Sequence, residues 1–403
     1  FFLGHEPKTK LGMGDYKRMH RETRAALDVL GIQIQTDRLI HGLSIAQQQM
    51  LEIARAINEN AKILIMDEPT ASLTNHEVDE LFTQIQALKE KNVAIIYISH
   101  RMEETFRVCD TVTVLRDGQF IGTKDTKETN EKELISMMVG REFESMYGNT
   151  VVSGGETIME VSRLTSDLVK DISFELKKGE ILGFSGLVGA GRTEMVRALF
   201  GIDKILSGTV TIEGKQVSIH APSDAIRAGI ALVPEDRKGQ GLFLEHSIST
   251  NLTFQVLDQF IRHLRVNGKK ERAIIQEYKD KLSIRMAGVE QKAGELSGGN
   301  QQKIVISKWL AAHPKVLILD EPTRGIDVGA KAEIYDLMRA LTKEGVSIIM
   351  ISSELPEILN NSSRIAVMSE GRLVKILDPA KDEISQEIIM SYAVEGGTKN
   401  HAQ

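Results

Sequence analysis

The sequence predicts two copies of one α/β domain, each built on a parallel sheet and joined in tandem. Its 403 residues exceed what one hydrophobic core usually spans, so we expect two domains. An internal repeat supports this, because Leu43 and Leu296 begin matching segments at an offset of 253, the difference between these two numbers. Short apolar runs also alternate with amphipathic stretches, a pattern typical of buried parallel strands joined by helices.

The offset of 253 holds along the chain without drift, which is the mark of a duplicated domain. We therefore expect a first domain over residues 1–147, a linker over 148–155 and a second domain over 156–396. The matching segments are Leu43-Ser44 with Leu296-Ser297, Asp67 to Thr70 with Asp320 to Thr323, Ser99 to Arg101 with Ser352 to Glu354, and Asp117-Gly118 with Glu370-Gly371.

The apolar runs predict the strands, and residues spaced as on one helix face predict the helices. A helix over Glu77–Lys89, capped by Thr74 or Asn75, recurs over Ala330–Leu341. The charged stretch between Ser247 and Gly294 predicts an inserted helical subdomain, and residues 1–42 its first-copy counterpart. Strands are expected at Ile63–Met66, Val93–Ile98, Gly179–Ser185, Val316–Leu319 and Val346–Ile351.

The strand at Gly179–Ser185 and the loop after it have no first-copy counterpart, since that would lie upstream of Phe1. The chain also starts without an initiator Met. We therefore expect the first domain to lack its N-terminal part and the chain to begin within its gene.

Composition narrows the function classes. The net charge of −6 argues against a general nucleic-acid clamp, because affinity for the phosphate backbone comes from surplus Lys and Arg. No apolar run approaches the length that crosses a bilayer. The single cysteine, Cys109, cannot form an internal disulfide, which favours a reducing compartment.

A glycine-rich loop between a predicted strand and helix indicates phosphate binding. Gly186, Gly189 and Gly191 let backbone N–H groups converge on phosphate oxygens at the positive end of a helix, and Thr193 can ligate Mg²⁺. Arg192 stands where this pattern expects lysine, and its bulkier, forked guanidinium should not reproduce lysine's contact with phosphate. A plain glycine-rich turn is the alternative reading, but the downstream Asp-Glu strand favours nucleotide binding.

Two predicted strands end in an Asp-Glu pair. Asp67 and Asp320 can hold Mg²⁺ through water, and Glu68 and Glu321 follow where a base could polarise an attacking water. Acidic residues at strand ends are often only solvated turns. Here the unit of apolar run, Asp, Glu, Pro and Thr occurs twice in register, which favours a functional interpretation.

Ser297, Gly298 and Gly299 at a predicted helix start make an anion site, with Gln301 in the next turn. With the phosphate loop and the Asp-Glu strand, this segment resembles the signature motif of ATP-binding cassette (ABC) ATPases, and the resemblance covers essentially the whole chain. It implies tandem P-loop NTPase domains, each a RecA-like core with a helical subdomain, and ATP and Mg²⁺ as cofactors. In that family two units dimerise head to tail, so each ATP lies between the phosphate loop of one and the signature of the other.

The departures from the family pattern fall on one composite site. The first signature has Ile45 and Ala46 where glycines are expected, and it would face the second copy's loop with Arg192. That copy also has Glu235 for a usual Gln and Ser353 for His100, and it lacks an aromatic between Tyr147 and Phe174 to stack on adenine. The other site would combine Asp67, catalytic Glu68 and His100 with the intact signature Ser297 to Gln301, so we expect it to be the catalytic one.

Several segments resemble the ATPase subunits of bacterial importers for monosaccharides such as ribose, galactose or xylose. By this resemblance the partners are transmembrane permease subunits and, indirectly, a sugar-binding protein, and the location is the cytoplasmic face of the membrane. Ribose is favoured, although autoinducer-2 and nucleoside importers share these motifs. The segments are Gly186 to Thr193, Val233 to Lys238, Leu296 to Lys303 and Asp320 to Ala330.

Two other classes remain open. Soluble tandem cassette proteins that act on ribosomes usually carry a long charged linker and two intact signatures, unlike this chain. A nucleotide sensor without turnover would not need Glu68 and His100. We therefore expect transport.

Overall fold

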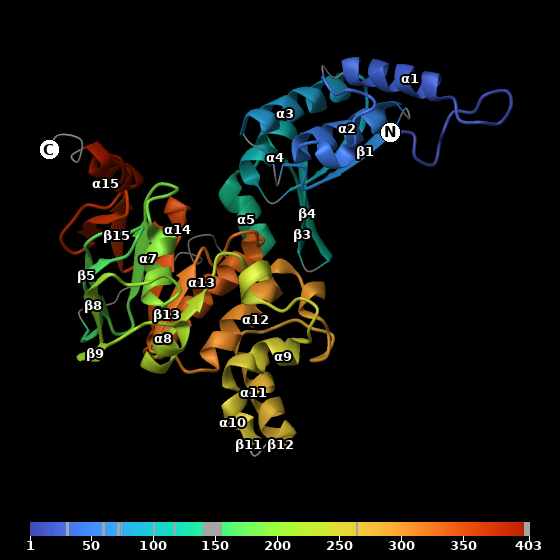
Figure 1. The fold of residues 1–403 in the computed structure, drawn as a ribbon. Helices are drawn as coiled ribbons and strands as arrows, with labels where there is room; N and C mark the ends of the chain where they lie inside the picture. Colours follow the sequence, from blue (N-terminus) through green and yellow to red (C-terminus); the bar gives the residue numbers. More distant parts are fainter. Residues whose placement is uncertain are drawn as a thin grey trace. The chain divides into compact units, whose positions relative to one another are not determined.

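The computed structural model describes residues 1–29, 32–58, 61–70, 73, 75–99, 101–116, 118–139, 155–262 and 265–398. It divides into two compact units, Phe1–Met138 and Val139–Gln403, and each is described below by itself (Figure 1). Residues 148–154 of the expected linker, the proposed cap Thr74, and His100 lie outside the described residues. Within the described ranges, no helix has the length and apolar character needed to cross a membrane.

The core of the second unit is a six-stranded sheet. In spatial order its strands are β10 (Ile230–Val233), β13 (Val316–Asp320), β14 (Ser347–Ile351), β7 (Ile181–Ser185), β15 (Arg364–Ser369) and β16 (Arg372–Leu377). The first five run parallel and β16 is antiparallel to β15. Every residue of β7, β13 and β14 is buried, as the continuous apolar runs predict for strands covered on both faces.

A second, antiparallel sheet packs against this core. Its strands, in order, are β6 (Ile172–Lys177), β5 (Thr157–Thr165), β8 (Ser207–Ile212) and β9 (Lys215–Val217). Burial alternates along β6, so one face points into the core, where Phe174 meets Phe184 of β7 edge-on at 5.2 Å between ring centroids. The two sheets therefore share one hydrophobic core.

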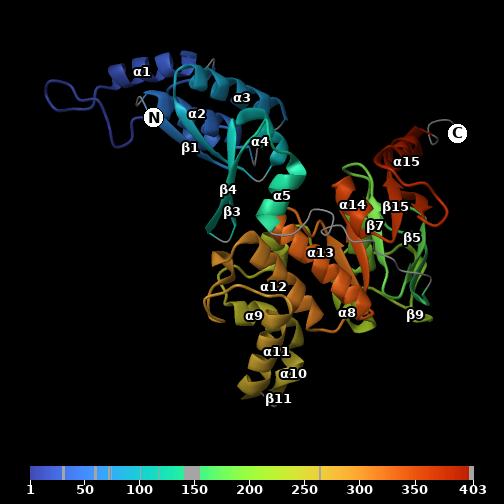
Figure 2. The ribbon, with the colours of Figure 1, turned by 180° about the vertical axis from the view of Figure 1, so that it is seen from behind.

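Helices flank the central sheet or form the lobe at the lower end of this unit in Figures 1 and 2, where α10, α11 and a short hairpin are labelled. The sequence predicted a helical insertion there, and the structure adds the hairpin β11 (Ile261–Arg262) and β12 (Arg265–Val266). The helices are α7 (Arg192–Leu199), α8 (Pro222–Ala228), α9 (Ile248–Thr253), α10 (Leu257–Phe260), α11 (Gly268–Lys281), α12 (Gly298–Leu310), α13 (Val328–Lys343), α14 (Leu355–Asn361) and α15 (Gln386–Thr398).

The first unit repeats part of this plan. Parallel strands β1 (Ile63–Asp67) and β2 (Ala94–Ile98) pair Asp67 with Ile98, the register in which β13 and β14 pair Asp320 with Ile351. Strands β3 (Thr111–Arg116) and β4 (Gln119–Asp125) form an antiparallel pair, as β15 and β16 do. Its helices are α1 (Tyr16–Val29), α2 (Ile45–Asn58), α3 (Asn75–Glu90), α4 (Met102–Val108) and α5 (Glu131–Val139).

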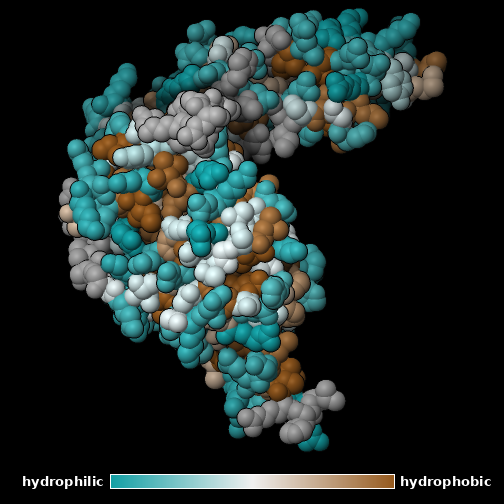
Figure 3. Space-filling model, turned by 60° about the vertical axis from the view of Figure 1, so that its left-hand side comes forward, coloured by the Kyte–Doolittle hydropathy of each residue, from teal (hydrophilic) through white to brown (hydrophobic). Residues whose placement is uncertain are grey.

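The two faces of the β1–β2 pair differ. Met66 packs in a core with Leu81 and Ile85 of α3, while Ile63 and Ile65 on the opposite face are 61% and 64% exposed. Figure 3 shows hydrophobic residues at the surface of the first unit. The equivalent residues of β13 are fully buried, because helices and strands cover both faces of that strand.

This contrast predicts a difference between two equivalent isoleucines. In the 403-residue chain, Ile318→Ala should lower the free energy of unfolding of the second unit by about 2–5 kcal/mol, because it leaves a cavity in a buried strand. The repeat-matched control Ile65→Ala should change the stability of the first unit by less than about 1 kcal/mol, since that side chain is exposed. Urea unfolding followed by hydrogen exchange measures both, and equal losses would contradict the difference in burial.

Candidate nucleotide site

The glycine-rich loop joins β7 to α7, and each glycine has its own physical reason. Gly186, Gly189 and Gly191 have φ values of 156°, 82° and 94°, which side chains rarely adopt. A Cβ on Gly186 would lie 2.4 Å from the Met368 carbonyl oxygen, and one on Gly191 would lie 2.9 Å from the Gly371 Cα. A Cβ on Gly189 would meet nothing within 4 Å, so this part of the loop is open to a ligand.

Arg192 is buried and turned toward the end of β14. Its Nη1 donates to the Ser352 carbonyl at 2.6 Å, and its Nη2 lies 4.0 Å from Glu321 Oε1. The guanidinium is therefore engaged by the protein itself. The sequence predicts that this residue does not reproduce the contact of the usual lysine with phosphate, and here its side chain contacts Ser352 and Glu321.

Asp320 ends β13 beside this loop and is 2% exposed. Burial raises the pKa of its carboxyl to about 6, while a hydrogen bond with Thr193 and the charge of Arg192 lower it. Its Oδ1 has no hydrogen-bond partner among the residues that the structure describes. A buried carboxylate oxygen without a partner, next to a threonine hydroxyl, fits a hard cation such as Mg²⁺.

The glutamate after each strand has an unusual backbone. Glu68 and Glu321 have φ values of 47° and 48°, and their N–H groups donate at 2.9 Å to the carbonyls of Ile98 and Ile351. Left-handed backbone is uncommon at non-glycine residues and concentrates at functional sites. The repeat alone gave no sign of this strain.

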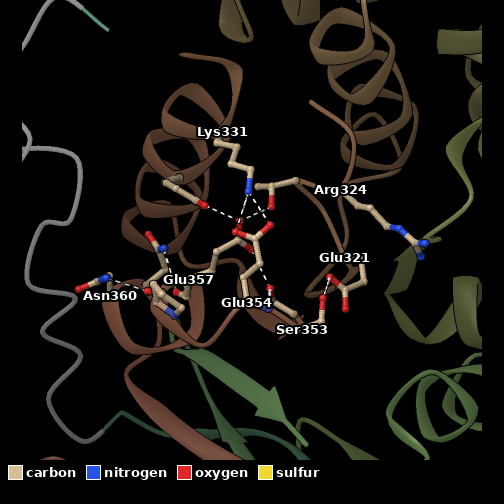
Figure 4. Close-up of polar contacts among 12 residues, drawn as sticks. Glu321, Arg324, Lys331, Ser353, Glu354, Glu357 and Asn360 are labelled. Carbon is tan, nitrogen blue, oxygen red and sulfur yellow. Dashed lines mark hydrogen bonds and ion pairs between the residues drawn. The ribbon is translucent and has the colours of Figure 1, made fainter. Parts of the chain in front are cut away.

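Burial and neighbouring groups shift the pKa of Glu321 in opposite directions. Burial raises the pKa of its carboxyl, and the charge of Arg192 and a hydrogen bond from Ser353 lower it. The Ser353 hydroxyl donates to Glu321 Oε2 at 3.2 Å, and the two side chains face each other in Figure 4. Ser353 thus occupies, beside this glutamate, the repeat position of His100.

The second signature lies at the start of α12. Ser297 is the N-cap residue and is exposed, and its hydroxyl oxygen accepts from Asn300 Nδ2 at 3.0 Å. Gly298 and Gly299 have no room for a side chain, because added Cβ atoms would lie 2.9 Å from Arg237 Nη2 and 2.6 Å from Ala330 Cβ.

Gln301, which the sequence predicts to bind nucleotide, is turned into the protein interior. Its side chain is 3% exposed, and Nε2 donates to the Ala293 carbonyl at 3.3 Å. In this arrangement it supports the loop before α12 from inside. The helical turn places it inward, one turn after the N-cap, which its polar character did not reveal.

The first signature has a different helix start. The Ser44 N–H donates to Gln47 Oε1 at 3.1 Å, and the Gln47 N–H donates to Ser44 Oγ at 3.2 Å. This reciprocal pair is a capping box. The Ser44 hydroxyl oxygen and its own N–H are therefore both used within the helix, while Ser297 makes no such cap.

The loop that contains Glu235 and Arg237 contacts the loop that contains Arg324 and Gly325, a contact that the sequence did not predict. Glu235 forms an ion pair with Arg324. Arg237 donates to the carbonyls of Arg324 and Gly325 at 2.6 and 2.9 Å, and burial lowers the pKa of its guanidinium. Glu235 was singled out only as a departure from the usual Gln, and its charge partner Arg324 gives that departure a physical reason.

The segment around Leu168 lies next to the phosphate loop, and the sequence gave no indication of this proximity. The Gly371 N–H donates to the Ala190 carbonyl at 3.0 Å, and the Lys170 N–H donates to the Gly371 carbonyl at 2.8 Å. This places the exposed Leu168 segment near the loop, in the part of the chain without an aromatic residue. An apolar side chain can cover an adenine face without stacking as a ring does.

The sequence-predicted residues group by unit. In the second unit, Arg192, Thr193, Asp320 and Glu321 share one edge of the sheet, and Ser297 to Gln301 lie at the start of α12. In the first unit, Asp67 and Glu68 lie at the end of β1. No cluster of three or more His, Cys, Asp or Glu side chains suited to a metal occurs within the described ranges.

A glycine-rich strand-to-helix loop and a buried strand-end aspartate beside its threonine define a P-loop nucleotide-binding site. The chain belongs to the ABC transporter family, whose profile matches residues 4–71 and 169–324. It is thus an ATP-binding ATPase of tandem cassettes, as the resemblance in the sequence implied.

Curated relatives resemble almost the whole chain. The ribose import ATP-binding protein RbsA of Lactococcus lactis subsp. lactis is 50% identical over 395 residues, which cover 98% of this chain and 80% of that protein. The proteins of the same name from Lacticaseibacillus paracasei and Geobacillus kaustophilus are 49% and 48% identical, each covered to 80%. Among solved structures, an ATP-binding cassette of an ABC transporter matches with a TM-score of 0.51 at 20% identity, covering 62% of this chain and 100% of that one. This last match supports the fold.

The raised pKa of Asp320 predicts a pH dependence of stability. A carboxyl whose pKa is about 6 when folded and near 4 when unfolded binds its proton more tightly in the folded state. Its contribution is therefore present below pH 4 and lost as the pH rises to 6, a change of roughly 3 kcal/mol. Asp320→Asn should remove this loss, so it should be more stable than the parent at pH 7.5 and equal to it at pH 4.

Urea unfolding from pH 4 to 8 measures this difference. The control Asp327→Asn alters an exposed capping aspartate of the same unit. A difference between parent and Asp320→Asn that does not change with pH would contradict the assignment.

Proposed function

We propose that this protein is the ATP-hydrolysing, energy-coupling subunit of an importer for a monosaccharide, with ribose as the favoured cargo. The observation that carries this is the 50% identity, over 98% of the chain, to a ribose import ATP-binding protein. The relatives named above are all import proteins, which favours transport over the ribosome-acting and nucleotide-sensing alternatives.

Mg²⁺ would accompany ATP in the second unit. Thr193 would hold it together with Asp320 Oδ1, which has no hydrogen-bond partner in the described part of the chain, and in the first unit Asp67 occupies the repeat position of Asp320. The ion neutralises phosphate charge when bound. The protein's own part is to present N–H groups from the Gly186 to Gly191 loop and to keep the site around Asp320 dry.

The two nucleotide sites would have unequal roles. In the second unit, Arg192 is bound to the Ser352 carbonyl and Glu235 is paired with Arg324, so both are occupied by protein contacts. In the first signature, which would face this site, the Ser44 hydroxyl oxygen accepts a hydrogen bond from the Gln47 N–H in a capping box. These contacts support the interpretation that this site is degenerate, whereas Glu68 and His100 with the signature Ser297 to Gln301 would carry turnover.

The partners would be transmembrane permease subunits and, through them, a sugar-binding protein. The protein would therefore sit peripherally on the cytoplasmic face of the membrane. The face shown in Figure 3 is chiefly hydrophilic with local hydrophobic patches, and such patches are compatible with docking to a partner.

Substitution of the two strand-end glutamates tests this function. In the complete protein assembled with its permease, Glu68→Gln should reduce steady-state ATP hydrolysis by at least about 100-fold, because it removes the general base. The repeat-matched Glu321→Gln should have a much smaller effect, since Glu321 would face the first signature, in which Ile45 and Ala46 replace the glycines. Phosphate release and ribose uptake into vesicles are the measurements, and equal losses would refute the asymmetry.

The two signatures offer a second matched pair. Ser297→Arg should block closure of the units and transport, because bulk and charge at a glycine-tight helix start would hold the ATP faces apart. ATP binding at the Arg192 loop should survive. Ser44→Arg should lower hydrolysis less, because that signature is already weakened. Parallel measurements of ATP binding, hydrolysis and uptake decide it, and greater damage from Ser44→Arg would reverse the two site assignments.

A further inference from the structure

Each unit holds a buried glutamate at the same repeat position, outside the motifs discussed so far. Glu104 in α4 is 6% exposed and Glu357 in α14 is 3% exposed, and their numbers differ by the repeat offset. Burying a carboxylate costs several kcal/mol unless it is paired and hydrogen-bonded. The hydrogen bonds around these two residues therefore show how the cost of burying each carboxylate is offset and which segments each carboxylate joins.

Glu357 collects four donors (Figure 4). The Ser352 hydroxyl donates to its Oε2 at 2.8 Å, while the Tyr335 hydroxyl and Lys331 Nζ donate to Oε1 at 2.6 and 3.2 Å. The hydroxyl of Thr323 also donates to Oε1. The carboxylate thus joins α13, α14, the end of β14 and the loop after β13.

Glu104 is surrounded in the same way. The hydroxyls of Thr70, Tyr97 and Ser99 donate to its Oε2 at 2.7, 2.8 and 3.3 Å, and Arg101 Nη1 donates to Oε1 at 3.1 Å. Burial and this carboxylate raise the pKa of Tyr97, which keeps its phenol protonated as a donor.

Only two of the donors to each glutamate occupy equivalent repeat positions in the two units. Thr70 and Ser99 are the repeat counterparts of Thr323 and Ser352. The phenol comes from β2 in the first unit and from α13 in the second, and the cation is Arg101 in one and Lys331 in the other. What the two units have in common is a carboxylate that binds one threonine and one serine.

These two hydroxyls stand next to the proposed chemistry. Thr70 and Thr323 come two residues after Glu68 and Glu321, whose backbones are left-handed. Ser99 and Ser352 come one residue before His100 and Ser353. The carboxylate therefore fixes the loop of the strand-end glutamate against the end of the neighbouring strand.

We propose that Glu104 is a positioning residue for ATP hydrolysis, holding the Glu68 loop in register with the end of β2 through Thr70 and Ser99, and that Glu357 is its counterpart in the degenerate site. This rests on the proposed function. Glu104 touches no nucleotide in this scheme and acts on the rate only through the two hydroxyls.

The tether itself is tested by hydrogen exchange on the 403-residue chain. Glu357→Gln keeps the size of the side chain but presents an amide donor to hydroxyls that need an acceptor. Exchange should rise at least about tenfold in residues 321–324 and 352–354 and change little in β10. Glu104→Gln should do the same at 68–70 and 98–99. Unchanged exchange in these segments overturns the tether.

The kinetic role is tested in the complete protein assembled with its permease. Glu104→Gln should lower kcat for ATP at least about tenfold, with KM and thermal midpoint close to the parent, whereas Glu357→Gln should lower kcat less than about threefold. Thr70→Val, which replaces the hydroxyl by a methyl group of similar size, should reproduce the kcat loss, and Thr70→Ser, which keeps the hydroxyl, should not. An unchanged kcat in Glu104→Gln and Thr70→Val, or a loss confined to KM, overturns the proposal.

The Glu68→Gln variant distinguishes a failure of the proposed catalytic site from a failure of the positioning role of Glu104. If it still hydrolyses ATP, the proposed catalytic site is wrong. If it is inactive while Glu104→Gln and Thr70→Val keep full kcat, the site stands and the positioning role is wrong.

Discussion

The parallel register of β13 on β14 is the constraint on which the rest of the second unit depends. Because Asp320 pairs with Ile351, both strands end at the same edge of the sheet, and the residues that follow them meet there. β7 pairs with β14 on its other side, so the glycine-rich loop opens at this edge too. A shift of one residue would turn every side chain to the opposite face and separate Asp320 from the loop.

Charge burial at this edge explains the contacts around it. Asp320, Arg192 and Glu357 are each nearly inaccessible, and an unpaired charge in such surroundings is costly. Arg192 is satisfied by the Ser352 carbonyl, and Glu357 by four donors. Of these three residues, Asp320 is the one that keeps an oxygen without a hydrogen-bond partner within the described part of the chain, and burial also raises its pKa.

The two units share one backbone plan but differ in the contacts made at equivalent positions. Both units keep the strand register, the left-handed glutamate and the buried carboxylate. They differ in the hydrogen bonds at the helix start of the signature, because the exposed Ser44 forms a capping box with Gln47, whereas the exposed Ser297 accepts from the Asn300 side chain. They differ also in the cation beside the buried carboxylate, Arg101 in one and Lys331 in the other. These local differences on a shared frame are what support the proposal of one catalytic and one degenerate site.

The sequence alone determined the α/β class, the duplication and the family, because apolar runs, a constant offset and glycine spacing are local properties of the chain. It also indicated Arg192 and Glu235 as departures. Tertiary structure decided what these departures contact, since Ser352 lies 160 positions from Arg192 and Arg324 lies 89 from Glu235. It likewise turned Gln301 inward and gathered four donors on Glu357. Such contacts depend on which distant strands become neighbours, and no local pattern encodes the direction in which a side chain then points.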